Sequence, residues 1–322
     1  MARTLFGAAS ESAISRQPTP REFFYDRMFR TLCFVGGALV ICLLTYIIYK
    51  IGERAVPAMD SYGFGFITTA VWDPGREQFG VLAEIWGTIY SSILALAIAG
   101  FFGVGMAIFL TQDFVPPKLA RVFRTIIELL AAIPSVVFGL WGIYVVIPAI
   151  RPISNWLHDN FGWIPFFETS LAGPGLAPAV IVLSIMVLPT VAAISQDAFQ
   201  LIPYKVKEAA YGMGTTKWEA ITKIFLPTAS SGIFASLVLG FGRALGETMA
   251  LAMLIGNSNL ISWSLFSPAN TLASLLASNW PEAGALEQQA LMYAAVVLLA
   301  ITLVVNALGT GIMAFSKKQT VS

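Results

Sequence analysis

Long apolar segments alternate with shorter polar ones along almost the whole chain. Six of these segments approach or exceed the roughly 20 residues that a helix needs to cross the hydrocarbon core of a bilayer, and nearly all of their residues are uncharged. They lie at about 31–50, 85–111, 122–149, 176–196, 228–256 and 290–315. The pattern predicts an all-α integral membrane protein with six transmembrane helices.

The polar segments differ in positive charge. Fourteen of the 19 Lys and Arg residues lie before the first span, at 112–124, at 203–227 or after the sixth span, four lie at the remaining connections, and one is Arg243. Because Lys and Arg are retained on the cytoplasmic side, both termini are predicted to be cytoplasmic. The membrane domain, 21–316, would then lie between cytoplasmic tails at 1–20 and 317–322. Residues 21–30 predict a short amphipathic helix along the membrane surface.

Composition supports the same class of protein. Hydrophobic residues make up 57% of the chain and charged residues only 11%, whereas about a quarter of a soluble domain is charged. The net charge of +1 gives no field that would attract nucleic acid. Cys33 and Cys42 lie on opposite faces of one predicted helix and cannot pair. With a single histidine, His158, we predict no metal-binding and no catalytic residues.

The segment 203–227, between the fourth and fifth spans, carries strong local signals. Gly212 and Gly214 predict the end of one short helix, because either can adopt the left-handed conformation, and Thr216 with Glu219 predicts a capping box that starts another. Pro227 is predicted to end that second helix and open the fifth span. The first helix would carry a small apolar stripe exposed to water, made of Val206, Ala209, Ala210 and Met213.

Two interpretations of this segment are open. An amphipathic helix pair can lie on the bilayer surface, or it can dock in a groove of another protein. The small side chains of Ala209 and Ala210 favour close contact with a protein, because insertion into lipid favours bulkier residues.

The spacing within this segment resembles the EAA loop of ABC importer membrane subunits. EAA is followed by three residues, a glycine, nine residues and IFLP, which gives matches at Glu208, Ala209, Ala210, Gly214, Ile224, Leu226 and Pro227. The resemblance implies the type I permease architecture, with this loop as the cytoplasmic coupling helix that seats in a cleft of the ATPase subunit. The chain has no G-x-x-x-x-G-K-[ST] motif, so the partner would bind ATP and Mg²⁺, and this chain no cofactor.

A narrower resemblance is to the phosphate-importer permeases of the PstC family. It covers FITTAVWDP (66–74), GTIYSSILALAIAGFFGVGMAIFL (87–110), IELLAAIPSVVFGLWGIYVVIP (127–148) and GRALGETMA (242–250). Glu128, ahead of the Ile-Pro-Ser-Val-Val run, favours this family over its partner permease. The resemblance implies phosphate import across a prokaryotic plasma membrane. The implied partners are a PstA-like permease, a PstB-like ATPase dimer and a PstS-like phosphate-binding protein.

The fifth predicted span contains two charges, Arg243 and Glu247, four residues apart. An arginine near the bilayer centre is costly and normally faces a bundle interior or a water-filled path. On one helix the two could form an ion pair that serves only packing. Alternatively, Arg243 offers a planar donor fork to phosphate oxygens and Glu247 holds the guanidinium in place. We favour the anion path, because Arg before Glu is the weaker order for such a pair.

Glu128 follows Arg124 by one turn near the start of the third predicted span. Snorkelling toward the membrane surface is the favoured interpretation, and a gate contact is the alternative. The predicted function is thus a permease subunit of an ATP-driven phosphate importer, without an enzyme activity of its own. Two alternatives are a permease for another oxyanion, such as sulfate, molybdate or phosphonate, and an intramembrane enzyme that uses Glu247 or Glu128 as a catalytic carboxylate.

Overall fold

The computed structural model describes residues 19–320, and their side chains up to Met313. The predicted tail 1–20 lies outside the described residues except for its last two, and the tail 317–322 lies inside except for its last two. Six described helices are long and apolar enough to cross a membrane: Pro20–Tyr62, Leu82–Thr111, Ser135–Phe161, Leu176–Gln200, Lys217–Leu245 and Ala285–Met313. The prediction of an all-α membrane protein with six spans is confirmed.

The first helix, α1 (Pro20–Tyr62), is one continuous element of 43 residues. The chain forms two units, the first of which ends at Glu53, so the last turns of α1 belong to the second unit. The sequence predicts a separate amphipathic helix at 21–30, but the structure has none. No proline or glycine lies between Pro20 and Gly36 to end such a helix, so it runs on into the apolar span.

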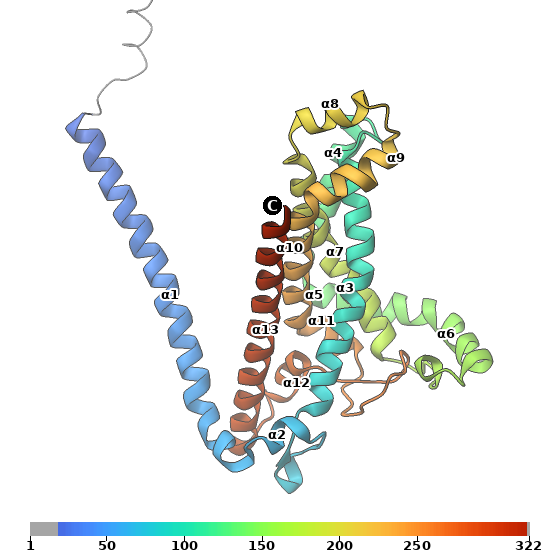
Figure 1. The fold of residues 1–322 in the computed structure, drawn as a ribbon. Coiled ribbons are helices and arrows are strands. Elements are labelled where there is room, and N and C mark those ends of the chain that lie inside the picture. The colour runs from blue at the N-terminus through green and yellow to red at the C-terminus, as the bar shows by residue number, and fades with distance from the viewer. Residues whose placement is uncertain (1–18, 321–322) are drawn as a thin grey trace, which may run out of the picture. The chain divides into compact units, whose positions relative to one another are not determined.

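The second unit is a helix bundle in which α7 packs against both α3 and α10, and α13 packs against α10 (Figure 1). The contact between α7 and α10 is close, since a Cβ at Gly240 would lie 2.8 Å from a methyl carbon of Val191. Small residues at a helix contact let two backbones approach closely within a membrane. The four helices are α3 (Leu82–Thr111), α7 (Leu176–Gln200), α10 (Leu226–Leu245) and α13 (Ala285–Thr320).

Two spans contain a π-turn directly before a proline. Gly142–Val146 precedes Pro148, and Ile221–Phe225 precedes Pro227. The wider turn accommodates a residue that has no N–H and whose ring would clash with an ordinary helical turn. The prediction that Pro227 ends a helix is therefore wrong, because the helix continues through it. The π-turns join α5 (Ser135–Trp141) to α6 (Ile147–Phe161), and α9 (Lys217–Ala220) to α10.

The third span begins later than the sequence predicts. The apolar pattern predicts a helix over 122–149, but α4 (Pro117–Ala131) ends before Pro134 and a new helix begins at Ser135. The residue before a proline is disfavoured in the helical region, which places the break at Ile133. The helix that follows then continues to Phe161. Its last part, 151–161, is rich in polar residues, a pattern that is typical of a loop.

The two ends of the second unit carry different structures. One end, which we call the α8–α9 end, contains α4, α8 (Tyr204–Gly212) and α9 (Figure 1). The other, the α2 end, holds α2 and a hairpin in which Trp72 pairs with Phe79. The remaining elements are α2 (Gly65–Thr68), β1 (Trp72–Asp73), η1 (Pro74–Arg76), β2 (Gln78–Phe79), η3 (Pro165–Phe167), α11 (Met249–Leu254) and α12 (Leu272–Asn279).

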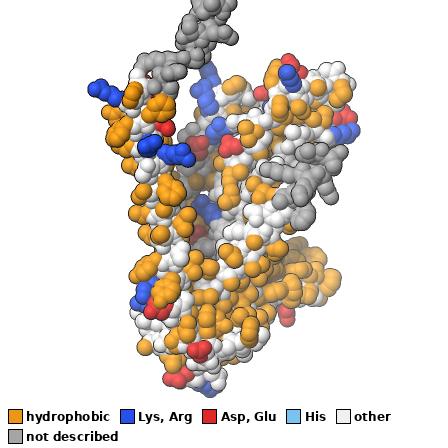
Figure 2. All heavy atoms as spheres, turned by 60° about the vertical axis from the view of Figure 1, so that its left-hand side comes forward, with side chains coloured by type: hydrophobic (Ala, Val, Ile, Leu, Met, Phe, Trp, Pro, Cys, Tyr) orange, Lys and Arg blue, Asp and Glu red, His pale blue; other side chains and the backbone are white. Residues whose placement is uncertain are grey.

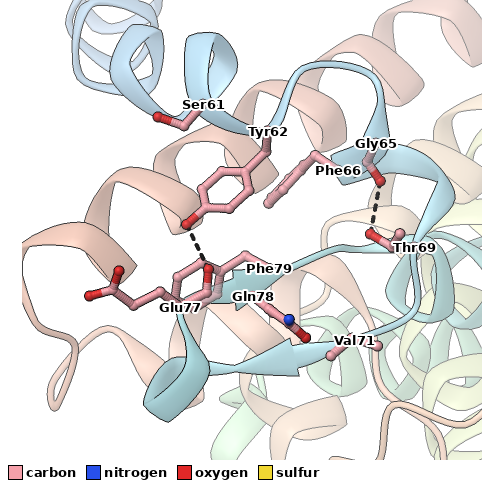
Figure 3. Close-up of a pocket in the computed structure, with 9 residues that line it drawn as sticks. All are labelled: Ser61, Tyr62, Gly65, Phe66, Thr69, Val71, Glu77, Gln78 and Phe79. Atoms are coloured by element: carbon pink, nitrogen blue, oxygen red, sulfur yellow. Dashed lines mark hydrogen bonds between the residues drawn. The ribbon is translucent and has the colours of Figure 1, made fainter.

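A cavity of about 440 Å³ lies between the hairpin and the last turn of α1, within the second unit (Figure 3). The Tyr62 hydroxyl donates a hydrogen bond to the carbonyl oxygen of Glu77 across it, at 2.9 Å. Phe66, on its wall, stacks on Tyr293 of α13 with 4.3 Å between ring centroids. None of the predicted site residues lines this cavity. The hydrogen bond of Tyr62 and the stacking of Phe66 on Tyr293 attach this region to α1 and α13.

The surface of the described residues is mostly apolar. Figure 2 shows hydrophobic side chains over most of the face in view, with most of the charged side chains toward its two ends. This distribution fits helices whose middle parts lie in lipid or against other membrane subunits.

Candidate functional site

The helix that carries Arg243 ends two residues after it. Helix α10 stops at Leu245, and α11 starts again only at Met249. The three residues between them are Gly246, Glu247 and Thr248, and the Thr248 hydroxyl donates to the Gly246 carbonyl at 3.1 Å. The predicted fifth span, 228–256, is therefore two helices joined by a short non-helical connection.

Arg243 contacts a neighbouring helix. Its Nη1 donates a hydrogen bond to Oγ1 of Thr190, in α7, at 3.3 Å. Arg243 is exposed on the surface of the chain, whereas Thr190 is half-buried. The guanidinium is thus held at the edge of the α7–α10 contact, on an exposed residue, with one of its donors bound to Thr190.

Glu247 does not hold Arg243. The two side chains form no ion pair with each other, although both belong to the part of the chain that the structure describes. Instead, Oε1 of Glu247 accepts a weak hydrogen bond from the backbone N–H of Ala250, at 3.5 Å, in the first turn of α11. Because the helix is interrupted between them, the four-residue spacing does not bring the two charges together. This corrects the predicted role of Glu247 in positioning the guanidinium.

The face that Arg243 shares with Ser236 and Gly240 is covered by α7. Oγ of Ser236 lies 2.9 Å from Oγ of Ser195 in a buried pair, and Gly240 contacts Val187 and Val191. This face therefore packs against another helix of the same chain up to Arg243, where it becomes exposed.

Glu128 lies apart from this pair of residues. It is exposed on α4, and it makes no hydrogen bond or ion pair with Arg243 or Glu247. Arg124, one turn earlier, does not pair with it either, because Nε of Arg124 donates to the side-chain oxygen of Gln196 at 3.0 Å. Among the described residues, Glu128 has no hydrogen-bond or ion-pair partner.

The α8–α9 loop has the two short helices that the sequence predicts. Thr216 and Glu219 form the capping box, with the Thr216 hydroxyl oxygen accepting from the N–H of Glu219 and the Glu219 carboxylate accepting from the N–H of Thr216. Gly214 has a φ of +78°, which a residue with a side chain rarely adopts. Lys217 anchors the second helix, since its Nζ donates to the Asp113 carbonyl at 3.2 Å. The predicted corner and cap are confirmed.

The residues of the predicted apolar stripe of α8 divide between a buried and an exposed side of the helix. Ala210 is buried and Val206 is partly buried in a small core with Phe199 and Phe225, so these two residues do not form the exposed stripe that the sequence predicts. Ala209 and Glu208 remain exposed. An α-helix packed on one side can present only part of a wide apolar stripe to water. Met213, the fourth residue of the predicted stripe, is exposed as predicted. With Leu201, Tyr204 and Trp218 it is one of the large apolar residues of 201–227 that are more than 70% exposed.

The other residues of the EAA pattern support the loop from within. Ile224 and Leu226 pack against the same small core, and Pro227 follows the π-turn that carries the chain into α10. The pattern thus combines residues that shape the loop with residues that remain on its surface. Sequence reasoning missed Thr190, because a single threonine in an apolar span has no pattern that links it to an arginine 53 residues away.

Comparison with known proteins places the chain in a class. The family described as binding-protein-dependent transport system inner membrane component matches residues 99–320. A solved bacterial alginate ABC transporter, in complex with an alginate pentasaccharide-bound periplasmic protein, covers 89% of this chain and 95% of its own, at 16% identity and a TM-score of 0.58. The MetNI methionine ABC transporter, in an inward-facing conformation, covers 73% and 95% at 18% identity and 0.56. These two share the fold.

Relatives in sequence are more specific. The phosphate transport system permease protein PstC of Haemophilus influenzae is 39% identical over 285 residues, covering 87% of this chain and 90% of its own. PstC of Mesorhizobium japonicum is 37% identical over 301 residues, 91% and 92%. PstC 2 of Mycobacterium tuberculosis is 38% identical over 304 residues, 92% and 93%. The chain belongs to the binding-protein-dependent inner membrane components and, within them, to the family of PstC permeases.

Proposed function

We propose that the chain is one membrane subunit of an ATP-driven phosphate importer and forms half of its translocation path. The observation that carries this proposal is the similarity to PstC permeases, which extends over about nine-tenths of both chains. An exposed arginine within an apolar helix agrees with it, because a charge at that depth has to face water, an anion or another protein.

Arg243 is proposed as the phosphate-contacting residue of the path. Its guanidinium has five N–H donors, of which Thr190 takes one, and a planar fork suits the oxygens of phosphate. Glu247 lies in the break between α10 and α11, two residues before α11 starts. A carboxylate near the path would oppose permanent capture of the anion, so we retain Glu247 as a path residue, without the role of holding Arg243.

The α8–α9 loop is proposed to couple this subunit to an ATPase. The rigid corner at Gly214 and the exposed Glu208 and Ala209 form its tip, and Ala210, Ile224, Leu226 and Pro227 give the tip its shape. ATP and Mg²⁺ would be bound by the ATPase dimer. A second, PstA-like permease would complete the path, and a phosphate-binding protein would deliver the anion at the α2 end.

This arrangement requires the α8–α9 end to be cytoplasmic. The Lys and Arg distribution supports that orientation and cytoplasmic termini. The test is cysteine labelling in intact cells, with Cys33 and Cys42 replaced by serine. A cysteine at exposed Ser278, near the α2 end, should react with a membrane-impermeant thiol reagent, and one at exposed Lys118, on α4, should react only after permeabilisation. The opposite pattern would reverse the orientation.

The substrate is tested by uptake. Membrane vesicles that contain the assembled complex should accumulate labelled phosphate when supplied with ATP and the binding protein. Unlabelled phosphate should suppress this uptake, whereas equal sulfate or molybdate should leave it nearly unchanged. Suppression by sulfate equal to that by phosphate would support the importer of another oxyanion, and substrate turnover by the purified chain alone would support the intramembrane enzyme.

A further inference from the structure

The threonine hydroxyls within the described spans donate to a backbone carbonyl of their own helix, and Thr190 is an exception. In the spans, these hydroxyls donate to a carbonyl one turn earlier in the same helix, as for Thr88, Thr111, Thr228 and Thr302, at 2.6–2.7 Å. The hydroxyl of Thr190 makes no such bond among the described residues. Its hydrogen bond is the one that its oxygen accepts from Arg243. Its proton therefore has no partner among the residues that the structure describes.

The α7–α10 contact fixes the position of this hydroxyl relative to the guanidinium. Ser195 and Ser236 bridge the contact at 2.9 Å, and Gly240 brings the two backbones together about one turn before Arg243. A tight contact limits how far the base of the arginine side chain can shift relative to Thr190. The helix contact alone would still let the guanidinium rotate. The hydrogen bond to Thr190 restricts this rotation.

Among the described residues, no carboxylate competes with Thr190 for Arg243. Glu247 is turned toward the N–H of Ala250, and the backbone break at 246–248 separates it from the guanidinium. In the described residues, Thr190 is the side chain that accepts a hydrogen bond from Arg243. A neutral acceptor orients a guanidinium and leaves its positive charge uncompensated, whereas a carboxylate would neutralise that charge.

We propose that Thr190 is the positioning residue of the anion path and that its free O–H adds a donor to the anion beside the fork of Arg243. This proposal rests on the proposed function. The site would accept an oxyanion at the exposed edge of the α7–α10 contact, because Thr190 takes one N–H of Arg243 and leaves the other donors of the exposed guanidinium available.

The test measures phosphate transported per ATP hydrolysed by the complete complex in proteoliposomes, with its second permease, ATPase and binding protein. Thr190→Val keeps the shape of the side chain and removes the hydroxyl. Because hydrogen bonds to charged groups are stronger than neutral ones, this ratio should fall by about tenfold, while co-purification of the subunits stays normal. Thr190→Ser restores a hydroxyl and should stay within about twofold of the unmodified complex.

A matched control is Thr302→Val in α13, whose hydroxyl bonds only to Leu298 of its own helix, at 2.7 Å. It should leave the ratio unchanged. A Thr190→Val complex that behaves like Thr302→Val would overturn the proposal. So would a parallel loss of assembly in Thr190→Val and Thr190→Ser, because that pattern reports packing.

Two further variants separate this proposal from the function on which it rests. If Arg243→Gln transports normally, the anion path at Arg243 is wrong, whatever Thr190 does. If Arg243→Gln abolishes transport and Thr190→Val does not reduce it, only the role of Thr190 is wrong. In an Arg243→Lys complex, which lacks the fork, Thr190→Val should reduce transport by less than about half of its usual factor. A full additional reduction would show that Thr190 acts independently of Arg243.

Discussion

Two of the places where a helix stops at a glycine and another begins within a few residues lie in the regions with a proposed function, and they are built differently. At the α8–α9 corner, Gly214 adopts a positive φ and a capping box starts the next helix, so each backbone requirement is met by a neighbouring residue. At the α10–α11 break, Gly246 has a φ of −94° and the first residues of α11 have no side-chain cap from Thr248. The first break is made by local chemistry. At the second, the local side-chain acceptor is Glu247, at 3.5 Å from the Ala250 N–H, and Ala250, Leu251 and Leu254 of α11 are buried in the core, so packing contributes more to this break.

This difference matters for function. A corner built from local interactions can transmit a movement of a partner subunit to the spans. Ala210 of α8 packs with Phe199 and Phe225 in a small core, which supports the corner. A break held by packing can change when the packing changes, and it lies beside Arg243, the arginine of the fifth span. We expect variants at the first place to affect coupling and variants at the second to affect the path itself.

The largest effect is expected at the second place. Arg243→Gln should abolish phosphate uptake while the complex still assembles, because the positive charge is lost and most of the volume is kept. Arg243→Lys should retain partial activity at best, since the planar fork is gone. Uptake beside subunit co-purification is the measurement.

Glu247 sharpens this prediction. Since Arg243 and Glu247 form no ion pair, Glu247→Gln should reduce uptake less than Arg243→Gln, and the double variant should remain inactive. Restored uptake in the double variant would show that the two charges act only by neutralising each other, against the proposed anion path.

A large effect is also expected at the corner. Gly214→Val should leave the protein in the membrane but uncouple ATP hydrolysis from transport, because a β-branched residue does not adopt a φ of +78° without strain. Nothing lies within 4 Å of a Cβ placed there, so the effect would come from the backbone and not from a clash. Gly214→Asn is the matched control, since asparagine tolerates this region, and it should retain coupled transport. Equal behaviour of both variants would contradict the backbone explanation.

A moderate effect is expected at the capping box. Thr216→Ala removes the side-chain acceptor of the Glu219 N–H and should destabilise the start of α9 by about 1 kcal/mol. Hydrogen exchange at residues 217–220 should increase about fivefold, with a smaller loss of coupling. Thr222→Ala, whose hydroxyl donates to the Trp218 carbonyl of the same helix, is the control and should change the exchange less. Unaltered exchange in Thr216→Ala would mean that packing alone fixes this helix.

The smallest effect is expected at Glu128. It is exposed on α4 and Arg124 is occupied by Gln196, so Glu128→Gln should change uptake by less than about twofold. Arg124→Gln serves as the comparison, because it alters the contact between α4 and α7 and should reduce uptake more. A strong loss in Glu128→Gln would favour the gate.

The sequence by itself determined the class of protein, the number of spans and the α8–α9 corner. Apolar segments of membrane length, glycine at a positive φ, and a hydroxyl three residues before a glutamate act over one to a few turns, so they can be read without the fold. The prolines were harder, because Pro227 was predicted to end a helix that a π-turn carries through it. The surroundings of Arg243 were decided only by the tertiary structure. Its partner, Thr190, comes from another helix, because helix packing and not sequence spacing fixes which side chains meet. The end of α10 at Leu245 keeps Glu247 from the helical position that a continuous helix would have given it relative to Arg243.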